Sequence, residues 1–217
     1  MKREFAVIFD MDGVLVDNYE YHRQAWALFL EKYGIDITGD FRNKIFGGTN
    51  REHLETFFKR KLTKEEIREL GSDKEAIYRN LYAGQIKPVE GLISFLTELR
   101  IHRIPVALAT SSPAINVRFV LKKTGTKNFF SLILDSSSVT KGKPDPEIYL
   151  KTAELLHVEP SQCIVFEDSI IGIIAAKAAG TRVIALTTTH HAGDLPEVDL
   201  IINDFTGMDL QVLEKLL

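Results

Sequence analysis

The sequence has few of the features that mark membrane proteins, nucleic-acid-binding proteins or disulfide-stabilised domains. It contains one cysteine, Cys163, which excludes an internal disulfide, and its place at the head of an apolar run is typical of a buried, unreactive thiol. No apolar stretch is long enough to span a bilayer, and no signal peptide precedes the first apolar segment. The formal net charge of −3 argues against nucleic acid or an anionic membrane as the main partner. We therefore expect a cytoplasmic protein.

The first apolar segment, residues 5–9, ends in two carboxylates. Five consecutive apolar residues are typical of a strand that is buried on both faces in a parallel sheet. Asp10 and Asp12 follow, and because side chains alternate along an extended segment, both would point to the same side. Gly13 then lets the backbone turn away. Two such acids repel each other and lose solvation, so either a cation lies beside them or they end the strand in solvent.

Amphipathic helices dominate residues 18–84, whereas strands and helices alternate from about residue 87 onward. The predicted strands of the second region are 105–109, 130–134, 164–166, 183–186 and 200–202. Helical segments separate them, including one that starts at Ser112 and Pro113 with the serine as its cap. This alternation predicts the α/β class with a doubly wound parallel sheet.

The connection between the first two strands is unusually long. A parallel crossover needs about a dozen residues and usually one helix, but here about ninety residues intervene. We therefore predict a core domain of residues 1–15 and 87–217, with a helical cap domain of residues 16–86 inserted into it. Because ligands of such sheets bind beyond the carboxyl ends of the strands, the cap would lie over the site as a lid.

Polar and charged side chains follow each of the first four strands, and parallel strands bring their carboxyl ends to one edge of the sheet. They are Asp10 and Asp12, then Thr110, Ser111 and Ser112, then Lys143, and finally Glu167 and Asp168. Four carboxylates at one edge favour a hard divalent cation, and Mg²⁺ suits this set. The hydroxyls, the lysine and the free N–H groups of the following helix favour an anion. A metal beside an anion site indicates phosphoryl transfer.

These residues resemble, in order and over nearly the whole chain, the four motifs of the haloacid dehalogenase superfamily of phosphotransferases. The motifs are Asp10-Met-Asp12-Gly-Val-Leu-Val-Asp17, Thr110, Lys143 within Gly-Lys-Pro-Asp-Pro, and Glu167-Asp168 within Phe-Glu-Asp-Ser-Ile-Ile-Gly. The resemblance implies a Rossmann-like core with a C1-type helical cap.

The same resemblance implies a role for each motif residue. Asp10 would be the nucleophile, and Asp12 the general acid and base. Thr110 and Lys143 would bind the phosphoryl group. The implied ligands of Mg²⁺ are the Asp10 carboxylate, the Asp12 carbonyl and the Asp168 carboxylate, with Glu167 acting through water.

The region after the first motif is similar to the cap of β-phosphoglucomutase. His22, Arg51 and Lys74 stand where that family has matching residues. The resemblance implies that the histidine guides the acid/base and that Arg51 and Lys74 bind the distal phosphate of a sugar bisphosphate. Packing is the alternative for His22, and a solvated helix face is the alternative for the other two. Three departures would remove polar contacts to the substrate, at Gly47, Ala114 and Asn18.

We therefore predict a monomeric Mg²⁺-dependent phosphohydrolase that acts on a small phosphorylated metabolite, such as a sugar phosphate, through an aspartyl phosphate on Asp10. A β-phosphoglucomutase-like isomerase is the alternative in which a sugar hydroxyl accepts the phosphoryl group. A non-catalytic module that binds phosphorylated ligands is a third hypothesis, although the complete acidic set favours an enzyme.

Overall fold

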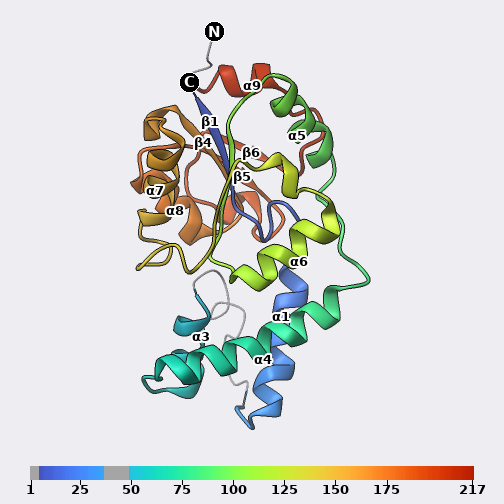
Figure 1. The fold of residues 1–217 in the computed structure, drawn as a ribbon, viewed down its shortest axis with the longest axis vertical. Helices are drawn as coiled ribbons and strands as arrows, with labels where there is room; N and C mark the ends of the chain where they lie inside the picture. The colour runs from blue at the N-terminus through green and yellow to red at the C-terminus, as the bar shows by residue number, and fades with distance from the viewer. Residues whose placement is uncertain (1–4, 37–48) are drawn as a thin grey trace.

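Six parallel strands form a single sheet in the computed structural model, which describes residues 5–36 and 49–217; Gly47 lies outside these ranges. The strands are β1 (Ala6–Phe9), β2 (Val106–Ala109), β3 (Leu132–Leu134), β4 (Cys163–Glu167), β5 (Arg182–Leu186) and β6 (Leu200–Ile202). They lie in the order β3-β2-β1-β4-β5-β6, and each pair is parallel. The chain fills one side of β1 and then the other (Figure 1), which confirms the doubly wound α/β prediction.

Helices cover both faces of this sheet. They are α5 (Leu92–Ile101), α6 (Ala114–Thr124), α7 (Glu147–Leu156), α8 (Ile170–Ala178) and α9 (Leu210–Glu214), with 3₁₀ turns at Lys127–Phe129, Pro160–Gln162 and Ala192–Asp194. In β1, Val7 and Phe9 pack with α5, α6 and α9, whereas Ala6 and Ile8 pack with α7 and α8. Successive side chains of a strand point to opposite faces, so burial on both sides explains the continuously apolar strand sequences.

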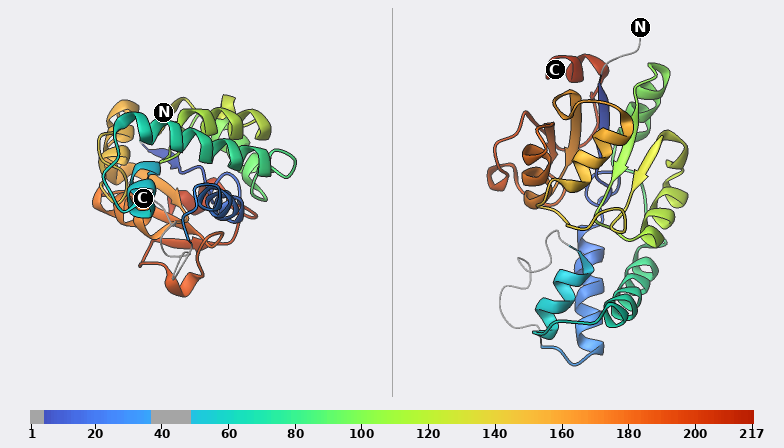
Figure 2. Two further views of the ribbon diagram at one scale, coloured as in Figure 1. Left: turned by 90° about the horizontal axis from the view of Figure 1, so that it is seen from below. Right: turned by 60° about the vertical axis from the view of Figure 1, so that its left-hand side comes forward.

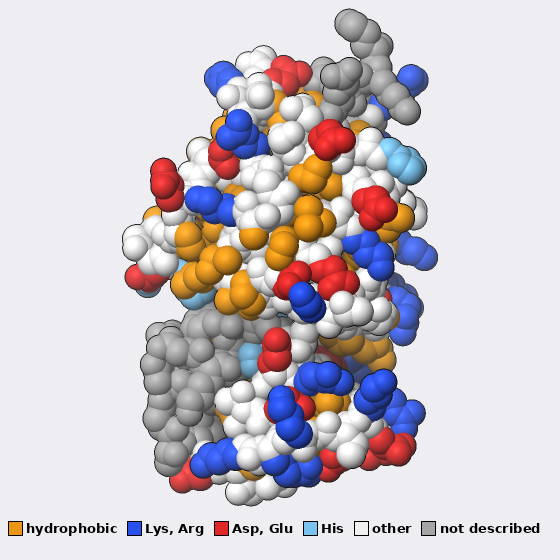
Figure 3. All heavy atoms as spheres, turned by 90° about the vertical axis from the view of Figure 1, so that its left-hand side faces the viewer, with side chains coloured by type: hydrophobic (Ala, Val, Ile, Leu, Met, Phe, Trp, Pro, Cys, Tyr) orange, Lys and Arg blue, Asp and Glu red, His pale blue; other side chains and the backbone are white. Residues whose placement is uncertain are grey.

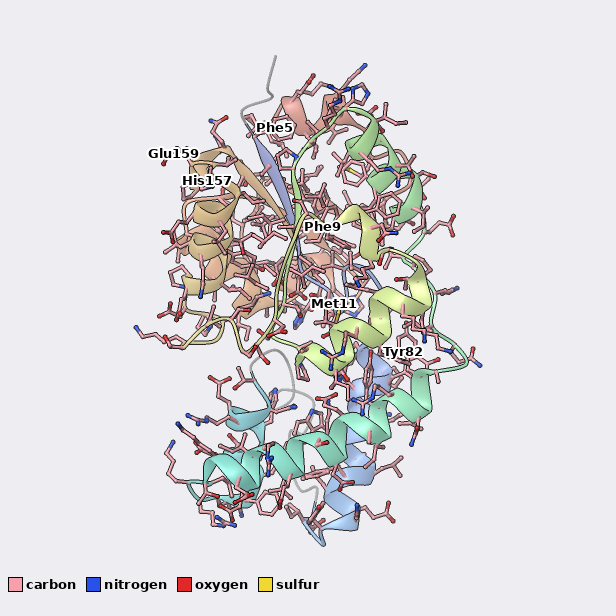
Figure 4. All side chains as sticks on the ribbon, viewed as in Figure 1. Phe5, Phe9, Met11, Tyr82, His157 and Glu159 are labelled. Atoms are coloured by element: carbon pink, nitrogen blue, oxygen red, sulfur yellow. The ribbon has the colours of Figure 1, made fainter. Side chains whose placement is uncertain are left out.

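Aromatic packing fixes the position of β1 at the centre of the sheet. The ring of Phe9 stacks on that of Phe166 in β4, with centroids 4.9 Å apart, and meets Phe95 of α5 edge to face at 6.2 Å. Each buried phenylalanine contributes about 1.5–3 kcal/mol through burial. Figure 4 shows Phe5 just before β1, Phe9 at its end and Met11 beyond it, toward the lower edge of the sheet. The carboxylates that come next are therefore anchored to rigid structure.

Three further helices form a group of their own below the sheet in the view of Figure 1, and Figure 2 shows the same arrangement from two other directions. They are α1 (Tyr19–Lys32), α3 (Asn50–Phe58) and α4 (Lys64–Tyr82). They share a separate hydrophobic cluster that includes Trp26 and Phe29. Capping boxes at Thr49 and Thr63 begin α3 and α4. The chain returns to the sheet region after Tyr82, which Figure 4 labels at the end of α4.

Cys163 opens β4, and its side chain is fully buried. Burial raises the pKa of its thiol to about 12, which fits the expected unreactive cysteine. Within the described ranges, no helix has the length and apolar character needed to cross a membrane.

The outer surface of α7 and α8 carries exposed hydrophobic side chains, among them Leu150, Leu155 and Ile174. Figure 3 views the molecule from this side, with hydrophobic groups in the upper part and charged groups prominent around the lower helices. Single exposed apolar residues are common on soluble proteins and do not define an interface. The monomeric state therefore stays a prediction.

Candidate active site

The carboxyl ends of β1, β2 and β4 lie side by side at the centre of the sheet, where the strand order reverses. A pocket opens there, facing the helices of the lower group. Its lining on the sheet side includes Asp10, Asp12, Thr110, Ser111, Ser112, Lys143 and Asp168, and its lining on the helical side includes His22, Trp26, Lys74 and Glu75. Switch points of open parallel sheets are the usual positions of ligand sites.

Asp10 shares one lysine with a second carboxylate. Nζ of Lys143 donates to Oδ1 of Asp10 at 2.8 Å and to Oε1 of Glu167 at 2.5 Å, and all three side chains are buried. Burial raises the pKa of Asp10 to about 7, although Lys143 acts in the opposite direction. Burial alone would lower the pKa of Lys143, but Asp10 and Glu167 hold it well above its ordinary value. The lysine is therefore a charged bridge between the two acids.

Glu167 is surrounded by hydrogen-bond donors of the protein. Its Oε1 also accepts from the hydroxyl of Tyr149 at 2.8 Å. Its Oε2 accepts from the N–H of Asp168 at 2.9 Å and from both the N–H and the hydroxyl of Ser169 at 3.0 Å. A carboxylate offers about four lone-pair sites, so these contacts occupy the group fully. The geometry favours Glu167 as the residue that orients Lys143, and its role toward a metal stays a prediction.

Asp168 completes an acidic cluster with Asp10 and Glu167, in which one ligand oxygen of each lies within 4.8 Å of the others. Burial, reinforced by the other two carboxylates, raises the pKa of Asp168 well above its ordinary value, even though the hydroxyl of Thr189 donates to its Oδ2. One lysine cannot balance three buried carboxylates, so the cluster lacks positive charge. The carboxylate oxygens of Asp10 and Asp168 fit a hard divalent cation such as Mg²⁺. The predicted contribution of the Asp12 carbonyl stays a prediction.

Asp12 has a different environment. Its Oδ1 accepts from Nδ2 of Asn18 at 2.6 Å and lies 3.5 Å from Nε2 of His22, while its Oδ2 accepts from the hydroxyl of Ser112. Burial alone would raise the pKa of Asp12, but His22, Ser112 and Asn18 lower it to about 2. Asp10 and Asp12, two residues apart, therefore have pKa values shifted in opposite directions.

The helix after β2 begins differently from the expectation. We predicted Ser112 as its cap, but α6 begins at Ala114 with Pro113 at the N-cap position, and no side chain caps it. The hydroxyl of Ser112 donates to the Asp12 carboxylate, whereas a capping serine would accept from a backbone N–H of the first helical turn. The prediction of a serine cap is therefore wrong. The N–H of Ser112 donates to Oγ1 of Thr110 at 3.1 Å, which orders the loop lining the pocket.

The three residues singled out in the cap sequence occupy different positions. His22 and Lys74 line the pocket, and Nδ1 of the first lies 2.9 Å from Nζ of the second. Lys74 is buried and also donates to Oε1 of Glu75 at 2.9 Å. Arg51 is exposed on α3, and the neighbouring Asn50 lines the pocket in its place. The solvated alternative fits Arg51, whereas Lys74 is a buried cation that already has an acidic partner.

The structure also adds contacts that we did not anticipate from the sequence. Asn18, interpreted as a lost substrate contact, donates to Asp12 and, at 2.7 Å, to the hydroxyl of Tyr78. Its Oδ1 accepts from the N–H of Gly13 at 3.2 Å. The hydroxyl of Thr188 donates to the carbonyl of Gly13 at 2.5 Å. The sequence signal for the last contact is a run of three threonines that directly follows β5, at the same edge of the sheet.

A family model described as haloacid dehalogenase-like hydrolase matches residues 7–186 of the chain. The chain belongs to this family. Validoxylamine A 7′-phosphate phosphatase from Streptomyces hygroscopicus subsp. limoneus is 32% identical over 205 residues, covering 93% of this chain and 94% of the relative. Beta-phosphoglucomutase from Bacillus subtilis (strain 168) is 31% identical over 218 residues, covering 97% and 94%.

The fold of this haloacid dehalogenase-like hydrolase is similar to that of a HAD hydrolase of family IA, variant 3, from Entamoeba histolytica HM-1:IMSS. The crystal structure of that protein matches with a TM-score of 0.87 and 30% identity over 98% of each chain. The resemblance found in the motifs is thus confirmed. The chain is an enzyme of the HAD phosphohydrolase or phosphoglucomutase-like type, and the non-catalytic hypothesis loses its support.

Proposed function

We propose that this hydrolase cleaves the phosphomonoester of a small metabolite, such as a sugar phosphate, in two steps through an aspartyl phosphate on Asp10. One observation carries the proposal. The Asp10 carboxylate accepts a hydrogen bond from the Lys143 ammonium, whereas the nearby Asp12 carboxylate accepts hydrogen bonds from neutral donors on Asn18 and Ser112. Two neighbouring carboxylates in such different environments can divide nucleophilic attack and proton transfer between them. In this proposal, residues 16–86 are the cap domain over a core of residues 1–15 and 87–217.

Mg²⁺ would be held by the Asp10 carboxylate, the Asp12 carbonyl and the Asp168 carboxylate. When bound, it supplies positive charge that keeps Asp10 ionised and neutralises the phosphoryl oxygens. Thr110 and Lys143 would contact the phosphoryl group. The excess of buried carboxylates over lysine in the acidic cluster supports this assignment.

In the first step, Oδ2 of Asp10 bonds to phosphorus while the ester P–O bond breaks, because Oδ1 is engaged by Lys143. Asp12 donates a proton to the leaving oxygen. In the second step, Asp12 takes a proton from a water whose oxygen bonds to phosphorus, and the P–O bond to Asp10 breaks. The negative charge of a bound phosphoryl group would raise the pKa of Asp12 so that it carries the first proton. Such proton transfer contributes about 10²–10⁴ in rate.

Hydrolysis is favoured over the mutase reaction by the pairing of the cations. A mutase that works through a bisphosphate must bind a second phosphate as well. Lys143 is engaged by two carboxylates, Lys74 is paired with Glu75, and Arg51 is exposed away from the pocket. Among the described residues that line the pocket, no lysine or arginine is left for a second phosphate. We therefore expect no contact from these described residues to a second phosphate of the substrate. A β-phosphoglucomutase-like isomerase is the second candidate function, because the relative from B. subtilis is a beta-phosphoglucomutase.

The test is a panel of phosphate esters with Mg²⁺, in which free phosphate and isomerised sugar phosphate are both measured. The panel includes β-glucose 1-phosphate with a trace of glucose 1,6-bisphosphate. Free phosphate supports hydrolysis, whereas glucose 6-phosphate without free phosphate supports the isomerase. Asp10→Asn should abolish turnover, and an active variant would disprove the covalent mechanism. Glu159→Gln, at an exposed position, is the control that should retain activity.

A further inference from the structure

A line of buried polar side chains joins the cap helices to the sheet region. Lys74 and Glu75 are consecutive on α4, yet they are only 2% and 3% exposed. Both can be buried because α4 contacts α1 as well as α6 (Figure 1). Lys74 accordingly meets His22 of α1, and Glu75 meets Asn116 of α6. Burying a charged group is costly unless it has hydrogen-bond and charge partners. The hydrogen bonds along this line therefore fix the orientation and the donor or acceptor role of each side chain in it.

Asn116 is fully buried and connects two charged groups of α4. Its Nδ2 donates to Oε2 of Glu75 at 2.6 Å, and its Oδ1 accepts from Nη1 of Arg79 at 2.9 Å. The opposite orientation of the amide would turn its NH₂ group toward the guanidinium and its oxygen toward the carboxylate. The two charges therefore determine the orientation of the amide. Asn116 thus holds Glu75 from the side of the core.

Lys74 connects Glu75 to His22 through two contacts of its ammonium group. Oε1 of Glu75 and Nδ1 of His22 both lie 2.9 Å from Nζ of Lys74, which is also 5.0 Å from the centroid of the Trp26 ring. An ammonium group has three donors and no acceptor, so Nδ1 must be the acceptor and carries no proton. The ring proton is then on Nε2, the nitrogen that lies 3.5 Å from Oδ1 of Asp12.

We propose that Glu75 and Asn116 are positioning residues for the proton-transfer step, an inference that rests on the function proposed above. Together they hold Nζ of Lys74 against Nδ1 of His22 and so leave the ring proton on Nε2, the nitrogen that faces Oδ1 of Asp12 at 3.5 Å. Without the carboxylate, Lys74 loses the counter-charge that Glu75 supplies, and the imidazole can present either nitrogen to Asp12. Both residues act through the histidine and not on the substrate.

The direct test is long-range ¹H–¹⁵N NMR of the histidine side chains, with His22 assigned by comparison with His22→Gln. The wild-type enzyme should show the Nε2–H tautomer at this residue. A proton on Nδ1 in the wild type would overturn the inference without any further variant. In Glu75→Gln and in Asn116→Ala the signal should become a mixture of tautomers, whereas Glu75→Asp, which keeps the charge, should retain the wild-type pattern.

Kinetics supply the second readout. Glu75→Gln should lower kcat about ten- to hundredfold, a part of what acid/base catalysis provides, while KM changes less than about twofold. The loss in kcat/KM should be larger for glucose 6-phosphate than for p-nitrophenyl phosphate, whose leaving group departs without a proton. The matched control is Asp73→Asn on the same helix, which removes the ion-pair partner of Lys32 at a more exposed position. It should leave kcat/KM unchanged for both substrates.

The results of these experiments distinguish a failure of the positioning role from a failure of the proposed two-step hydrolysis. A lower melting temperature with equal losses for both substrates and an unchanged tautomer would show a merely structural bridge and reject the inference. If Asp10→Asn is inactive while Glu75→Gln and Asn116→Ala match the wild type, the inference alone is wrong. If Asp10→Asn remains active, the two-step reaction itself is wrong.

Discussion

Replacing Asp168 by asparagine should stabilise the metal-free enzyme and remove its response to magnesium. The side chain is buried, and its ligand oxygen lies within 4.8 Å of those of Asp10 and Glu167. At an effective dielectric constant of about 20, two unit charges 4.8 Å apart interact by about 3.5 kcal/mol. Lys143 offsets at most one of the two repulsions, because its effect on the pKa of Asp168 is smaller than that of either carboxylate. About 3.5 kcal/mol of repulsion remains, and the neutral amide, which is similar in size, would relieve it.

The assay is thermal unfolding in EDTA and in millimolar MgCl₂. For a chain of this length, 1 kcal/mol shifts Tm by about 2–4 °C, so Asp168→Asn should melt about 7–14 °C above the wild type in EDTA at about pH 8. Magnesium should raise the Tm of the wild type, because a ligand that binds only the folded state stabilises it. The variant lacks the carboxylate that we propose as a metal ligand and should show no such rise.

The sign of the pH dependence provides a further check. Burial and the neighbouring acids raise the pKa of Asp168 above its unfolded value. The stability associated with its protonation is therefore present at low pH and lost as the pH rises through the folded pKa. The advantage of Asp168→Asn should consequently shrink toward about pH 4, near the ordinary pKa of an aspartate.

A surface variant controls for the general effect of removing a negative charge. Glu159 lies at the opposite end of the molecule from α1, α3 and α4, as Figure 4 shows, and Glu159→Gln should shift Tm by less than about 2 °C in either buffer. A destabilised Asp168→Asn in EDTA, or a rise in its Tm with magnesium equal to that of the wild type, would refute the electrostatic account of the cluster.

Three further predictions concern single positions. Cys163 should resist a thiol reagent at about pH 8 in the folded enzyme and react fully in denaturant, because burial raises its pKa to about 12; rapid modification of the native protein would contradict this. Gly172→Ala should cost about 3 kcal/mol in chemical denaturation, since the new Cβ would lie 1.9 Å from Oε1 of Glu167; unchanged stability would mean that the carboxylate moves freely. Asn18→Ala should lower kcat about tenfold in a phosphate-release assay, because Asp12 loses a donor at 2.6 Å; wild-type kcat would show that this contact does not orient the acid.

Much of the fold could be predicted because parallel strands buried on both faces produce continuous apolar runs. The sequence placed strands at 164–166 and 183–186, and the structure has Cys163–Glu167 and Arg182–Leu186. The third strand is shorter than the predicted 130–134, since the N–H of Phe130 still donates to the carbonyl of Lys127 and continues the preceding 3₁₀ turn. A local turn of this kind competes with strand pairing in a way that hydrophobic pattern does not reveal.

The sheet topology predicts which residues of the strand ends line the pocket, but it does not predict which of the pocket side chains hydrogen-bond to one another. Strand ends in a parallel sheet meet at one edge, which is why Asp10, Lys143 and Asp168 lie together although they are far apart in the chain. The bond between Glu75 and Asn116 joins residues 41 positions apart on different groups of helices. It depends on how α4 packs against α6, and neither periodicity nor spacing encodes that placement.

The burial of Cys163 has a practical consequence for measuring motion. With no accessible native thiol, cysteines introduced at exposed positions can be labelled selectively without first replacing a core residue. Leu28 on α1 and Ile101 on α5 are 45% and 71% exposed, one in the lower helical group and the other against the sheet. A pair of spin labels at these positions would report the distance between the two parts of the enzyme before, during and after turnover.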